Sequence, residues 1–458
     1  MKVVFIASEA VPFAKTGGLA DVAGALPRSL VNSGIDTQII LPRYKGIGGK
    51  KEWSAHLKMA VDHRVDYYRQ DNYIFIDNRD FYARDGLYGD SSGDFPDNCE
   101  RFTFFCRAAL KVLERESYDI VHCHDWQSGL VPLYMKSKRL KARSVFTIHN
   151  LGYQGKFSKD KFPILGIEKK YFSPGGLEFY GDVNFLKAGI VYADAVTTVS
   201  PNYAREIQTP ELGFGLDGVL RTRANDLHGI LNGIDYEQWN PSSDKLLYEQ
   251  YVDFDGKQRN KSRLCSDHGL DTNRPLIGVV SRIAGQKGFD ILLCALDEII
   301  KMGYNMIILG FGEESYHHKL LKLQDVYHGR LCVNIKFDNK LAHRIYAGSD
   351  FFLMPSKYEP CGLGQLISLR YGTVPIVRST GGLADTVHEF DSENLSGNGF
   401  LFTEYSGRAL ASAAETARDV FRQAEKYRSL SESCMKYDFS WEESAKKYAQ
   451  LYAGLLSS

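Results

Sequence analysis

Short apolar runs, each followed by a stretch with helical spacing, recur along the whole sequence and restrict its possible folds more than any other feature. The runs are rich in Val and Ile and have the length of strands that are buried on both faces. Because these runs alternate with helical segments, they predict βαβ units and parallel sheets, which is the α/β class. Two series are present, residues 3–7, 37–41, 119–123, 144–148, 196–199 and 227–231, and then residues 276–280, 306–309, 333–336, 351–354 and 374–377.

A polar stretch between the two series, residues 240–274, marks a change in composition. It contains Pro241, paired serines and the charged run KQRNKSR, which is typical of a solvated helix face. We therefore place the domain junction in this stretch. The prediction is an N-terminal domain over residues 1–241 and a C-terminal domain over residues 242–438.

The last segment, residues 439–458, predicts a separate helix. Ser440 and Glu443 form a capping box at its start. The side chains that follow at helical spacing form one apolar face, which indicates a packing surface rather than a cofactor site. This face consists of Trp441, Ala445, Tyr448, Tyr452 and Leu455.

Composition argues against several classes of protein. Lys and Arg total 56 and Asp and Glu total 56, so the formal net charge is zero, which disfavours binding to nucleic acid through bulk electrostatics. No run approaches the ~18 apolar residues that a membrane span needs, and the run at 3–7 is too short for a secretory signal. Eight cysteines without a CxxC pair suit a reducing compartment and form no zinc-site pattern. We expect a cytoplasmic protein, or a plastid stromal one if the source is a plant or alga.

The hexapeptide TGGLAD occurs twice, at residues 16–21 and 380–385, each time after a predicted strand and at the predicted start of a helix. Glycines at a helix N-terminus let backbone N–H groups approach an anion, and the helix dipole adds partial positive charge. Lys15 adds a full charge directly before the first copy. The segment KTGGLADV therefore predicts a phosphate or pyrophosphate site, and the alternative is a plain glycine turn into a helix.

Two loops after strands of the second series carry charged residues. SRIAGQKG contains Arg282 and Lys287, and two cations beyond a strand end can clamp a leaving diphosphate. PSKYEPCGLGQL contains Glu359, whose carboxylate can bind sugar hydroxyls or stabilise a developing oxocarbenium charge. Taken alone, the two cations are better explained as surface charges, and the carboxylate motif leaves both interpretations open.

Two loops after strands of the first series carry a histidine and an aspartate. His149 in TIHNLGYQG can bind a sugar hydroxyl, although a single histidine after a strand is more often structural. CHDWQ contains Asp125 and Trp126, and the indole ring suits either sugar stacking or core packing.

We predict no metal site. Asp253 and Asp255 resemble the DxD triplet that holds a divalent cation under a nucleotide sugar, but they lie in the polar junction, and such triplets are frequent by chance. His122 and His124 alternate along a predicted strand, and we expect them to point to opposite faces, which opposes joint ligation. The sequence also lacks the complete GxGxxG, GxxxxGK[ST] and GxSxG motifs.

Taken together, these motifs resemble the glycogen synthase and bacterial-type starch synthase family, which is glycosyltransferase family 5. The resemblance spans nearly the whole chain, and the order of KTGGLADV before EPCGLGQL is highly specific. The segments that carry it are ASEAVPFAKTGGLADVAGALP, HCHDWQSGL, FTIHNLGYQG, GILNGIDYEQWNP, SRIAGQKGFD, MPSKYEPCGLGQL and STGGLADTV.

The resemblance implies a GT-B fold, in which two Rossmann-like doubly wound domains face an interdomain cleft and the final helix crosses back to the N-terminal domain. It implies transfer of glucose from a nucleotide-glucose to the non-reducing end of an α-1,4-glucan or malto-oligosaccharide, with retention at the anomeric carbon and without metal or other cofactor. Bacterial-type relatives favour ADP-glucose as donor, and UDP-glucose stays an alternative. Oligomeric state cannot be predicted from the sequence.

The resemblance also assigns roles to particular residues. Lys15, Gly17 and Gly18 would contact the donor's phosphates or sugar, and Arg282 and Lys287 would bind the diphosphate. Glu359 would lie near the reacting carbon, and His149 would bind the transferred glucose. The remaining substrate-binding residues that it implies are Asn232 beside His149, Cys361, Gly362 and Leu363 in the loop of Glu359, Thr380 and Gly381 near the ribose and phosphates, and Asp125 and Tyr88 on the acceptor side.

Three other classes remain as alternatives at this point. A Rossmann oxidoreductase is disfavoured because the GxGxxG motif is incomplete. A sugar phosphorylase would need pyridoxal phosphate on a lysine, and no lysine is placed distinctively for it. A non-catalytic glucan-binding or regulatory protein would have no need for the cations directed at phosphate.

Overall fold

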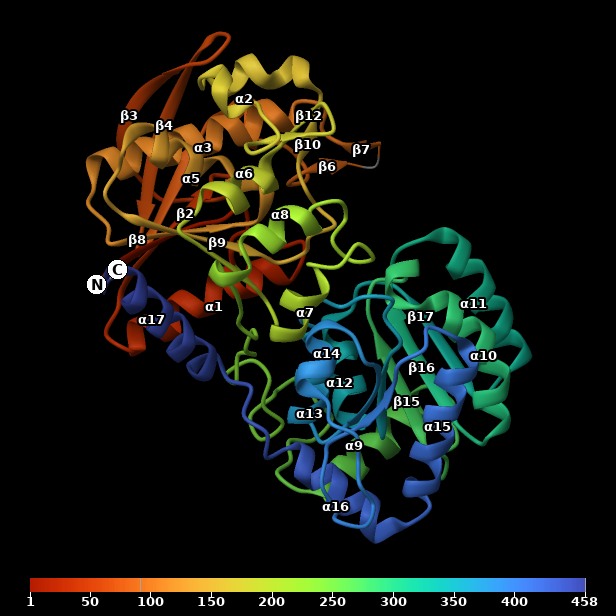
Figure 1. Cartoon of the computed structure of the whole chain (residues 1–458). Coiled ribbons are helices and arrows are strands. Elements are labelled where there is room, and N and C mark those ends of the chain that lie inside the picture. The colour runs from red at the N-terminus through yellow and green to blue at the C-terminus, as the bar shows by residue number, and fades with distance from the viewer. Residues whose placement is uncertain (91, 458) are drawn as a thin grey trace. The chain divides into compact units, whose positions relative to one another are not determined.

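The computed structural model describes residues 1–90 and 92–457, which fold into two compact units. Unit 1 contains Met1–Asn232 together with the final helix, α17 (Trp441–Ser457), and unit 2 contains Gly233–Ser440. Figure 1 shows α17 in blue beside the red helix α1 (Gly18–Asn32), although the two lie at opposite ends of the chain. No helix in the described ranges is long and apolar enough to cross a membrane.

Unit 1 is built around a mixed sheet whose strand order is β14-β13-β9-β8-β1-β2-β5-β4-β3. The strands from β14 to β5 are parallel, and β4 and β3 add an antiparallel edge. Their bounds are β1 (Lys2–Ile6), β2 (Asp36–Pro42), β3 (Lys50–Lys58), β4 (Asp62–Gln70), β5 (Tyr73–Asp77), β8 (Ile120–His124), β9 (Arg143–Ile148), β13 (Ala195–Thr198) and β14 (Leu227–Gly229).

Helices cover both faces of this sheet, with α1 and α17 on one side and α3, α5 and α6 on the other (Figure 1). The longer of these are α3 (Asn98–Arg115), α5 (Leu130–Lys138) and α6 (Phe185–Tyr192). The shorter elements are α2 (Arg79–Tyr82), β6 (Gly89–Asp90), β7 (Gly93–Asp94), α4 (Asp125–Ser128), β10 (Lys156–Phe157), η1 (Lys159–Leu165), η2 (Lys169–Tyr171), β11 (Glu178–Phe179), β12 (Asp182–Asn184), α7 (Pro201–Glu206), α8 (Asp217–Thr222) and η3 (Ala224–Asp226).

Unit 2 contains a parallel sheet with the strand order β17-β16-β15-β18-β19-β20. Its strands are β15 (Leu276–Val280), β16 (Asn305–Gly310), β17 (Leu331–Ile335), β18 (Phe351–Met354), β19 (Val374–Arg378) and β20 (Phe400–Phe402). Its helices are α9 (Phe254–Asp267), η4 (Gly285–Lys287), α10 (Phe289–Lys301), α11 (Glu314–Val326), α12 (Asn339–Gly348), α13 (Gly364–Arg370), α14 (Gly381–Thr386), α15 (Gly407–Phe421) and α16 (Ala424–Cys434).

The strands of unit 2 are apolar on both faces because each face is covered by helices. Met306 and Ile308 of β16 belong to the cluster formed with α10 and α15, whereas Ile307 and Leu309 belong to the cluster formed with α9 and α12. This two-sided burial explains the unbroken apolar runs, and each run of both predicted series forms a strand.

The boundary between the units differs from the predicted one. Unit 1 ends at Asn232 rather than at residue 241. The intervening residues belong to unit 2 because their aromatic side chains pack there: the Trp239 ring stacks on His343 with 4.0 Å between centroids, and the Tyr236 hydroxyl accepts a hydrogen bond from the Phe439 N–H at 2.8 Å.

The charged run KQRNKSR was expected to be a solvated helix face, and this is only partly right. It lies in α9, but Lys257 and Lys261 are buried. Lys257 Nζ donates to the Ala347 carbonyl at 2.9 Å and to Thr373 Oγ1, and Lys261 forms an ion pair of 2.7 Å with the buried Asp350. A lysine side chain is long enough to bring its amino group to polar partners on the buried side of the helix. Composition alone does not reveal such partners.

The chain crosses between the units twice. Hydrogen bonds join the two crossing segments to each other, one in unit 1 and one in unit 2. In unit 1, Ser444 Oγ donates to the Leu231 carbonyl at 2.6 Å. In unit 2, the Ile234 N–H donates to the Phe439 carbonyl at 2.8 Å. We call residues 231–234 and 439–444 the double connection.

Candidate active site

The candidate residues of unit 1 follow strands that run in parallel. Asp125 follows β8, His149 follows β9, and Asn232 comes shortly after β14. Parallel strands end at one edge of the sheet, and ligands of open α/β sheets bind beyond that edge. The local fold therefore gathers these side chains, together with the loop after β1, on one side of unit 1.

Glu9, a residue that the sequence analysis did not single out, connects the loop after β1. Its carboxylate is almost fully buried. It accepts hydrogen bonds from the Thr16 N–H at 2.5 Å, from Thr16 Oγ1 at 2.6 Å and from the Tyr88 hydroxyl at 2.6 Å. The signal in the sequence was a carboxylate three residues after the end of β1 and eight residues before Gly17.

The first TGGLAD copy lies in an exposed turn and starts α1, as predicted. Gly17 precedes the helix, and a Cβ built on it would have no atom within 4 Å. The first N–H groups of this turn are partly occupied, since Glu9 also accepts from the Gly17 N–H at 3.3 Å. Lys15 is about half exposed and forms an ion pair of 2.7 Å with Asp21. Gly18 is exposed as well.

Asp125 and His149 contact each other through the backbone. The His149 N–H donates to Asp125 Oδ1 at 2.8 Å, and Asp125 adopts a left-handed conformation with φ of 55°. Burial raises the pKa of the Asp125 carboxyl to about 7, against the lowering effect of the backbone N–H groups of His149 and Asn150. Burial also lowers the pKa of His149 to about 3, so its imidazole is neutral.

The expectation that His122 and His124 point to opposite faces of their strand was wrong. Their ring centroids are 4.2 Å apart, because residues two apart in a strand share a face. Both rings are buried, and burial lowers the pKa of both well below the usual value. His124 Nδ1 lies 2.9 Å from His149 Nε2, so the strand end and the candidate histidine form one hydrogen-bonded pair.

Three further residues of unit 1 were singled out by the sequence. Asn232 is buried, and its side-chain Oδ1 has no hydrogen-bond partner within the described part of the chain. Trp126 packs edge-on against Phe102 and Phe157, with centroids 4.8 and 5.8 Å away, which favours the core-packing interpretation of this indole. The hydroxyl of Tyr88 is within 2.7 Å of Ser8 Oγ, and burial raises its pKa well above the usual value.

In unit 2, the structure brings Lys287 and Glu359 together. Lys287 lies in the turn after β15, Glu359 lies in the loop after β18, and Lys287 Nζ is 2.6 Å from Glu359 Oε2. Ser356 Oγ donates to the same carboxylate oxygen at 2.9 Å. Arg282, which precedes Lys287 in the same loop, is exposed. Its guanidinium donates to Gln286 Oε1 at 3.1 Å.

The second TGGLAD copy supports the loop of Glu359 and is buried, unlike the first copy. It also starts a helix, α14, with Thr380 just before it. A Cβ on Gly381 would lie 1.8 Å from the Glu359 carbonyl oxygen, and one on Gly382 would lie 2.1 Å from the Cys361 carbonyl oxygen. The Gly382 N–H donates to the Glu359 carbonyl at 3.1 Å.

The residues after Glu359 turn directly into α13. Gly362 has a positive φ of 74°, which favours glycine, and Leu363 is the residue that precedes the helix. Gln365 holds the turn, because its Nε2 donates to the carbonyl oxygens of Cys361 and Gly362 at 3.0 Å each. These contacts hold the backbone of the loop that carries Glu359.

The DxD-like triplet has structural partners. Asp253 caps α9, since its Oδ1 accepts from the Gly256 N–H at 2.8 Å. Asp255 forms an ion pair of 3.2 Å with Arg428. Within the described residues, no three His, Cys, Asp or Glu side chains cluster as metal ligands would.

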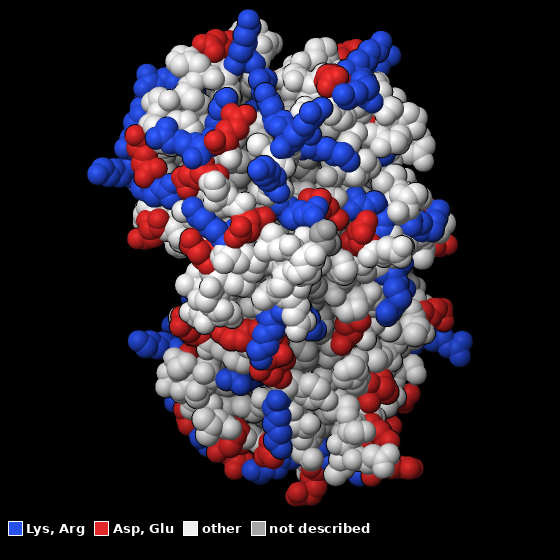
Figure 2. Space-filling model, turned by 60° about the vertical axis from the view of Figure 1, so that its left-hand side comes forward, with Lys and Arg blue, Asp and Glu red and all other residues white. Residues whose placement is uncertain are grey.

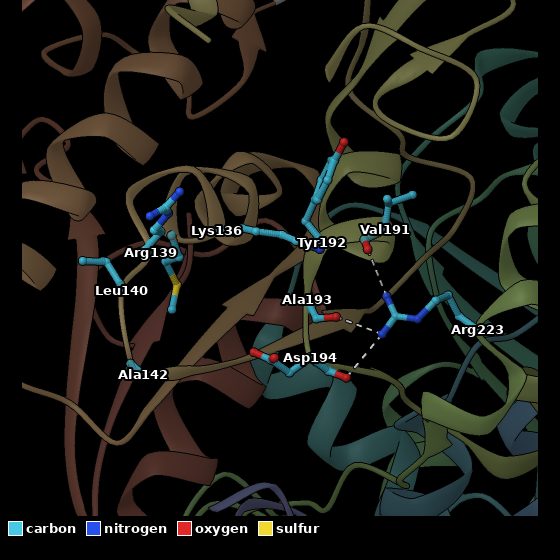
Figure 3. A pocket seen from close by; sticks show the side chains of 10 residues that line it. Lys136, Arg139, Leu140, Ala142, Val191, Tyr192, Ala193, Asp194 and Arg223 are labelled. Atoms are coloured by element: carbon cyan, nitrogen blue, oxygen red, sulfur yellow. Dashed lines mark hydrogen bonds between the residues drawn. The ribbon is translucent and has the colours of Figure 1, made fainter. Parts of the chain in front are cut away.

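None of the candidate residues lines a hollow of about 450 Å³ in unit 1 (Figure 3). Figure 3 shows the Arg223 guanidinium turned toward carbonyl oxygens at the end of α6, and it donates to those of Ala193 at 2.8 Å and Val191 at 3.2 Å. Lys136 lies over the Tyr192 ring at 5.6 Å from the centroid. Figure 2 shows basic side chains gathered over part of the same unit, with acidic ones interspersed.

The structure therefore groups the candidates within each unit. Lys15, Gly17, Gly18, Tyr88, Asp125, His149 and Asn232 belong to unit 1, and Arg282, Lys287, Glu359, Cys361, Gly362, Leu363, Thr380 and Gly381 belong to unit 2.

Comparison with family models gives one match for each half of the chain. Residues 2–222 match a model described as the starch synthase catalytic domain, and residues 260–433 match glycosyl transferases group 1. Curated relatives match over the full length. Glycogen synthase from Desulforudis audaxviator is 45% identical, covering 99% of this chain and 96% of the relative, and glycogen synthase from Geotalea daltonii is 45% identical, covering 100% and 99%.

Two solved structures resemble the whole chain. The catalytic domain of starch synthase IV from Arabidopsis thaliana, bound to ADP and acarbose, superposes with a TM-score of 0.90 at 33% identity and covers 100% of this chain and 99% of that chain. Sucrose-phosphate synthase from Thermosynechococcus elongatus, at 18% identity and a TM-score of 0.65 over 100% of this chain and 99% of that one, shares the fold.

Proposed function

Because this chain belongs to the glycogen and starch synthase family of glycosyltransferases and has its GT-B fold of two Rossmann-like domains, we propose that it transfers glucose from ADP-glucose to the non-reducing end of an α-1,4-glucan. The reaction proceeds with retention at the anomeric carbon and without a metal ion. The ADP bound to the starch synthase IV domain supports this choice of nucleotide, and the acarbose beside it supports a glucan-like acceptor.

The observation that carries the proposal is the contact between Lys287 and Glu359, with 2.6 Å between Nζ and Oε2. It places a cation and a carboxylate together beyond the ends of two neighbouring strands, where a sugar and its diphosphate need opposite charges. In the proposed function, Lys287 and Arg282 bind the diphosphate, and Glu359 lies beside the anomeric carbon. The donor site around Glu359 is lined by Thr380, Gly381, Cys361, Gly362 and Leu363.

Unit 1 supplies the remaining groups in this proposal. Lys15, Gly17 and Gly18 contact the donor, because they are exposed at the start of α1, where the helix dipole favours an anion. His149 and Asn232 bind the transferred glucose, and the unpartnered Oδ1 of Asn232 is suited to a hydroxyl donor. Asp125 and Tyr88 lie on the acceptor side.

The charges favour a reaction in which the acceptor attacks from the face that the diphosphate leaves. The bond between the anomeric carbon and the diphosphate oxygen breaks, the acceptor hydroxyl oxygen forms the new bond, and its proton passes to a diphosphate oxygen. The cations stabilise the negative charge that develops on the leaving group, which is worth several kcal/mol in a closed site. Glu359 stabilises the positive charge at the anomeric carbon.

The first test is the incubation of purified protein with labelled ADP-glucose or UDP-glucose and a malto-oligosaccharide, with a chelator present. We expect chain extension from ADP-glucose, with a product α-linked at the anomeric carbon, and the same rate with and without the chelator. Binding of glucan without transfer from either donor would favour a binding protein, and faster transfer from UDP-glucose would reverse the donor assignment.

The second test is Arg282→Ala. We expect kcat to fall by about 10²-fold or more, the scale of one lost electrostatic contact to a developing charge. Arg263→Ala is the matched control, since Arg263 is an exposed arginine of unit 2 that carries no proposed role. Near-normal turnover of Arg282→Ala would remove this residue from the mechanism, and a glucose ester trapped on Glu359 would replace the same-face reaction with a covalent one.

A further inference from the structure

Two imidazole rings share one hydrogen bond in unit 1, at the point where the neighbouring strands β8 and β9 end. His124 is the last residue of β8 and fully buried, and His149 is the first residue after β9. Nδ1 of His124 lies 2.9 Å from Nε2 of His149. A contact between two ring nitrogens needs an N–H on one side and a lone pair on the other. The position of the shared proton therefore fixes the tautomer of both rings.

Both rings are neutral, so each carries a single N–H. Burial lowers the pKa of His149 to about 3 and that of His124 well below its usual value. Two arrangements are left. Either His149 donates through Nε2 and His124 holds its own proton on Nε2, or His124 donates through Nδ1 and His149 holds its proton on Nδ1.

The far nitrogen of His124 decides between them. Its Nε2 is buried and has no hydrogen-bond partner among the residues that the structure describes. In the first arrangement this nitrogen is a buried N–H without an acceptor, and in the second it is a lone pair without a donor. Buried N–H groups without an acceptor are rarer in folded proteins than buried lone pairs without a donor, which favours the second arrangement.

The far nitrogen of His149 does not oppose this choice. Nδ1 of His149 has no protein partner within the described ranges, and the residue is only partly buried, so solvent or a ligand reaches this nitrogen. Either protonation state of Nδ1 can therefore be satisfied from outside the protein. The choice between the two tautomers therefore depends on the buried ring of His124.

We propose that His124 is a positioning residue that donates its Nδ1–H to His149 and thereby keeps the proton of His149 on Nδ1, the nitrogen open to substrate. His149 then binds an oxygen of the sugar as a hydrogen-bond donor and does not act as a base through that nitrogen. The proposal rests on the proposed function for the identity of the sugar, but the tautomer itself is a property of the free protein.

The ring of His124 is held in place by its neighbours. Phe5 of β1 stacks on it with 5.5 Å between centroids and an interplanar angle of 15°. The ring of His122 covers it at 4.2 Å, and His122 is itself fixed through both nitrogens, with Nδ1 at 2.7 Å from the Tyr452 hydroxyl and Nε2 at 2.6 Å from Thr147 Oγ1. A ring so restrained keeps its Nδ1 aimed at His149.

The direct test is nitrogen NMR of the full chain labelled with ¹⁵N-histidine, with the His149 signals identified by their loss in His149→Gln. We expect His149 to carry its proton on Nδ1 and a lone pair on Nε2. A proton on Nε2 of His149, or an imidazolium, would overturn the proposal. Because this measurement needs no turnover, its result stands even if the protein transfers no glucose from any donor.

A pair of variants separates positioning from packing. His124→Asn keeps an N–H donor near the position of Nδ1, whereas His124→Leu fills the same apolar space without one. We expect His124→Asn to have a kcat/KM about tenfold higher than His124→Leu, as for one restored hydrogen bond, and the NMR signals of His149 to show mixed tautomers only in the leucine variant. If packing alone mattered, leucine would serve as well as asparagine, and that result would reject the role.

Discussion

The glycines of the two TGGLAD copies are needed for different physical reasons. Gly17 has an extended φ of −154° and free space around it, so any requirement for glycine there comes from a ligand. Gly381 has a φ of 47°, and a Cβ there would lie 1.8 Å from the Glu359 carbonyl oxygen. The same hexapeptide is thus an exposed turn in unit 1 and a support for the Glu359 loop in unit 2.

This difference predicts opposite outcomes for one substitution. Gly381→Ala should lower the free energy of unfolding of unit 2 by about 2 kcal/mol or more, since it adds both backbone strain and a steric overlap. Gly17→Ala should leave the thermal midpoint unchanged and raise KM for the donor. Calorimetry with steady-state kinetics on both variants measures the contrast, and equal midpoints would contradict it.

Lys257 predicts a pH dependence of stability. Burial lowers its pKa from 10.5 to about 7, so between these values the unfolded chain binds a proton that the folded chain does not. The free energy of unfolding of unit 2 should therefore rise as the pH rises from about 7 to about 10. Below pH 7, the folded protein bears the full cost of a buried charged lysine.

Lys257→Met tests this dependence. The urea midpoint of the wild type minus that of the variant should increase from pH 7 to pH 9.5, because the variant lacks the titrating group. Lys322→Met, a change at an exposed lysine of unit 2, should give a constant difference. A wild-type and variant pair that respond identically to pH would exclude Lys257 as the cause.

Single residues show where sequence reasoning ended. Glu9 and His124 became significant only through contacts with Thr16, Tyr88 and His149, which lie 7 to 79 residues away in the chain. The identity of these side chains was visible, but their partners were not, because hydrogen bonds between loops depend on where parallel strands end.

At the scale of elements, α17 behaves as the sequence predicted. Trp441, Ala445, Tyr448 and Tyr452 are buried along one face, and Leu455 is half-buried. The face packs on α1, and the Tyr452 hydroxyl reaches His122 at 2.7 Å. The last helix of the chain is therefore part of the support of the histidine pair.

Tyr452→Phe should lower the stability of unit 1 by about 1–3 kcal/mol, since it leaves a buried nitrogen of His122 without a partner. The measurement is chemical denaturation followed by the near-ultraviolet signal of unit 1 aromatic residues. Lys447→Ala, on the exposed face of the same helix, should change stability by less than about 0.5 kcal/mol. Equal effects of the two changes would refute the role of the hydroxyl.

Elements differed in how visible they were in the sequence. Most strands buried on both faces produced apolar runs and were predicted, but the short strands β5 and β20 were not. The antiparallel strands β3 and β4 at one end of the sheet were not predicted either, because most of their side chains are at least partly exposed and charged residues interrupt the alternation. Trp53 of β3 stacks on Tyr67 of β4 at 3.6 Å between centroids, a cross-strand pair that only the register reveals.

At the scale of the whole molecule, the double connection is the feature with testable consequences. Each passage between the units is short, and hydrogen bonds tie the two passages on both sides. Such pairing confines bending to the few residues between the ties, and domain closure in a transferase of two units depends on such bending.

Cutting one passage should therefore reduce activity without unfolding the protein. A protease site inserted between Ser440 and Trp441 leaves α17 held by its buried face after cleavage. We expect the cleaved protein to stay associated on a sizing column and to lose about tenfold or more in kcat, as reacting groups become less well placed. An identical site inserted between Asn394 and Leu395, in an exposed loop, should change kcat by less than about twofold after cleavage.

The same feature has a consequence for engineering. Unit 2 is one uninterrupted stretch, Gly233–Ser440, whereas unit 1 is assembled from both ends of the polypeptide. A chimera that replaces only Gly233–Ser440 with the same segment of another family member needs two junctions and leaves every residue of unit 1 unchanged. If residues 233–440 determine the nucleotide preference, the chimera should have the preference of the protein that supplied this segment.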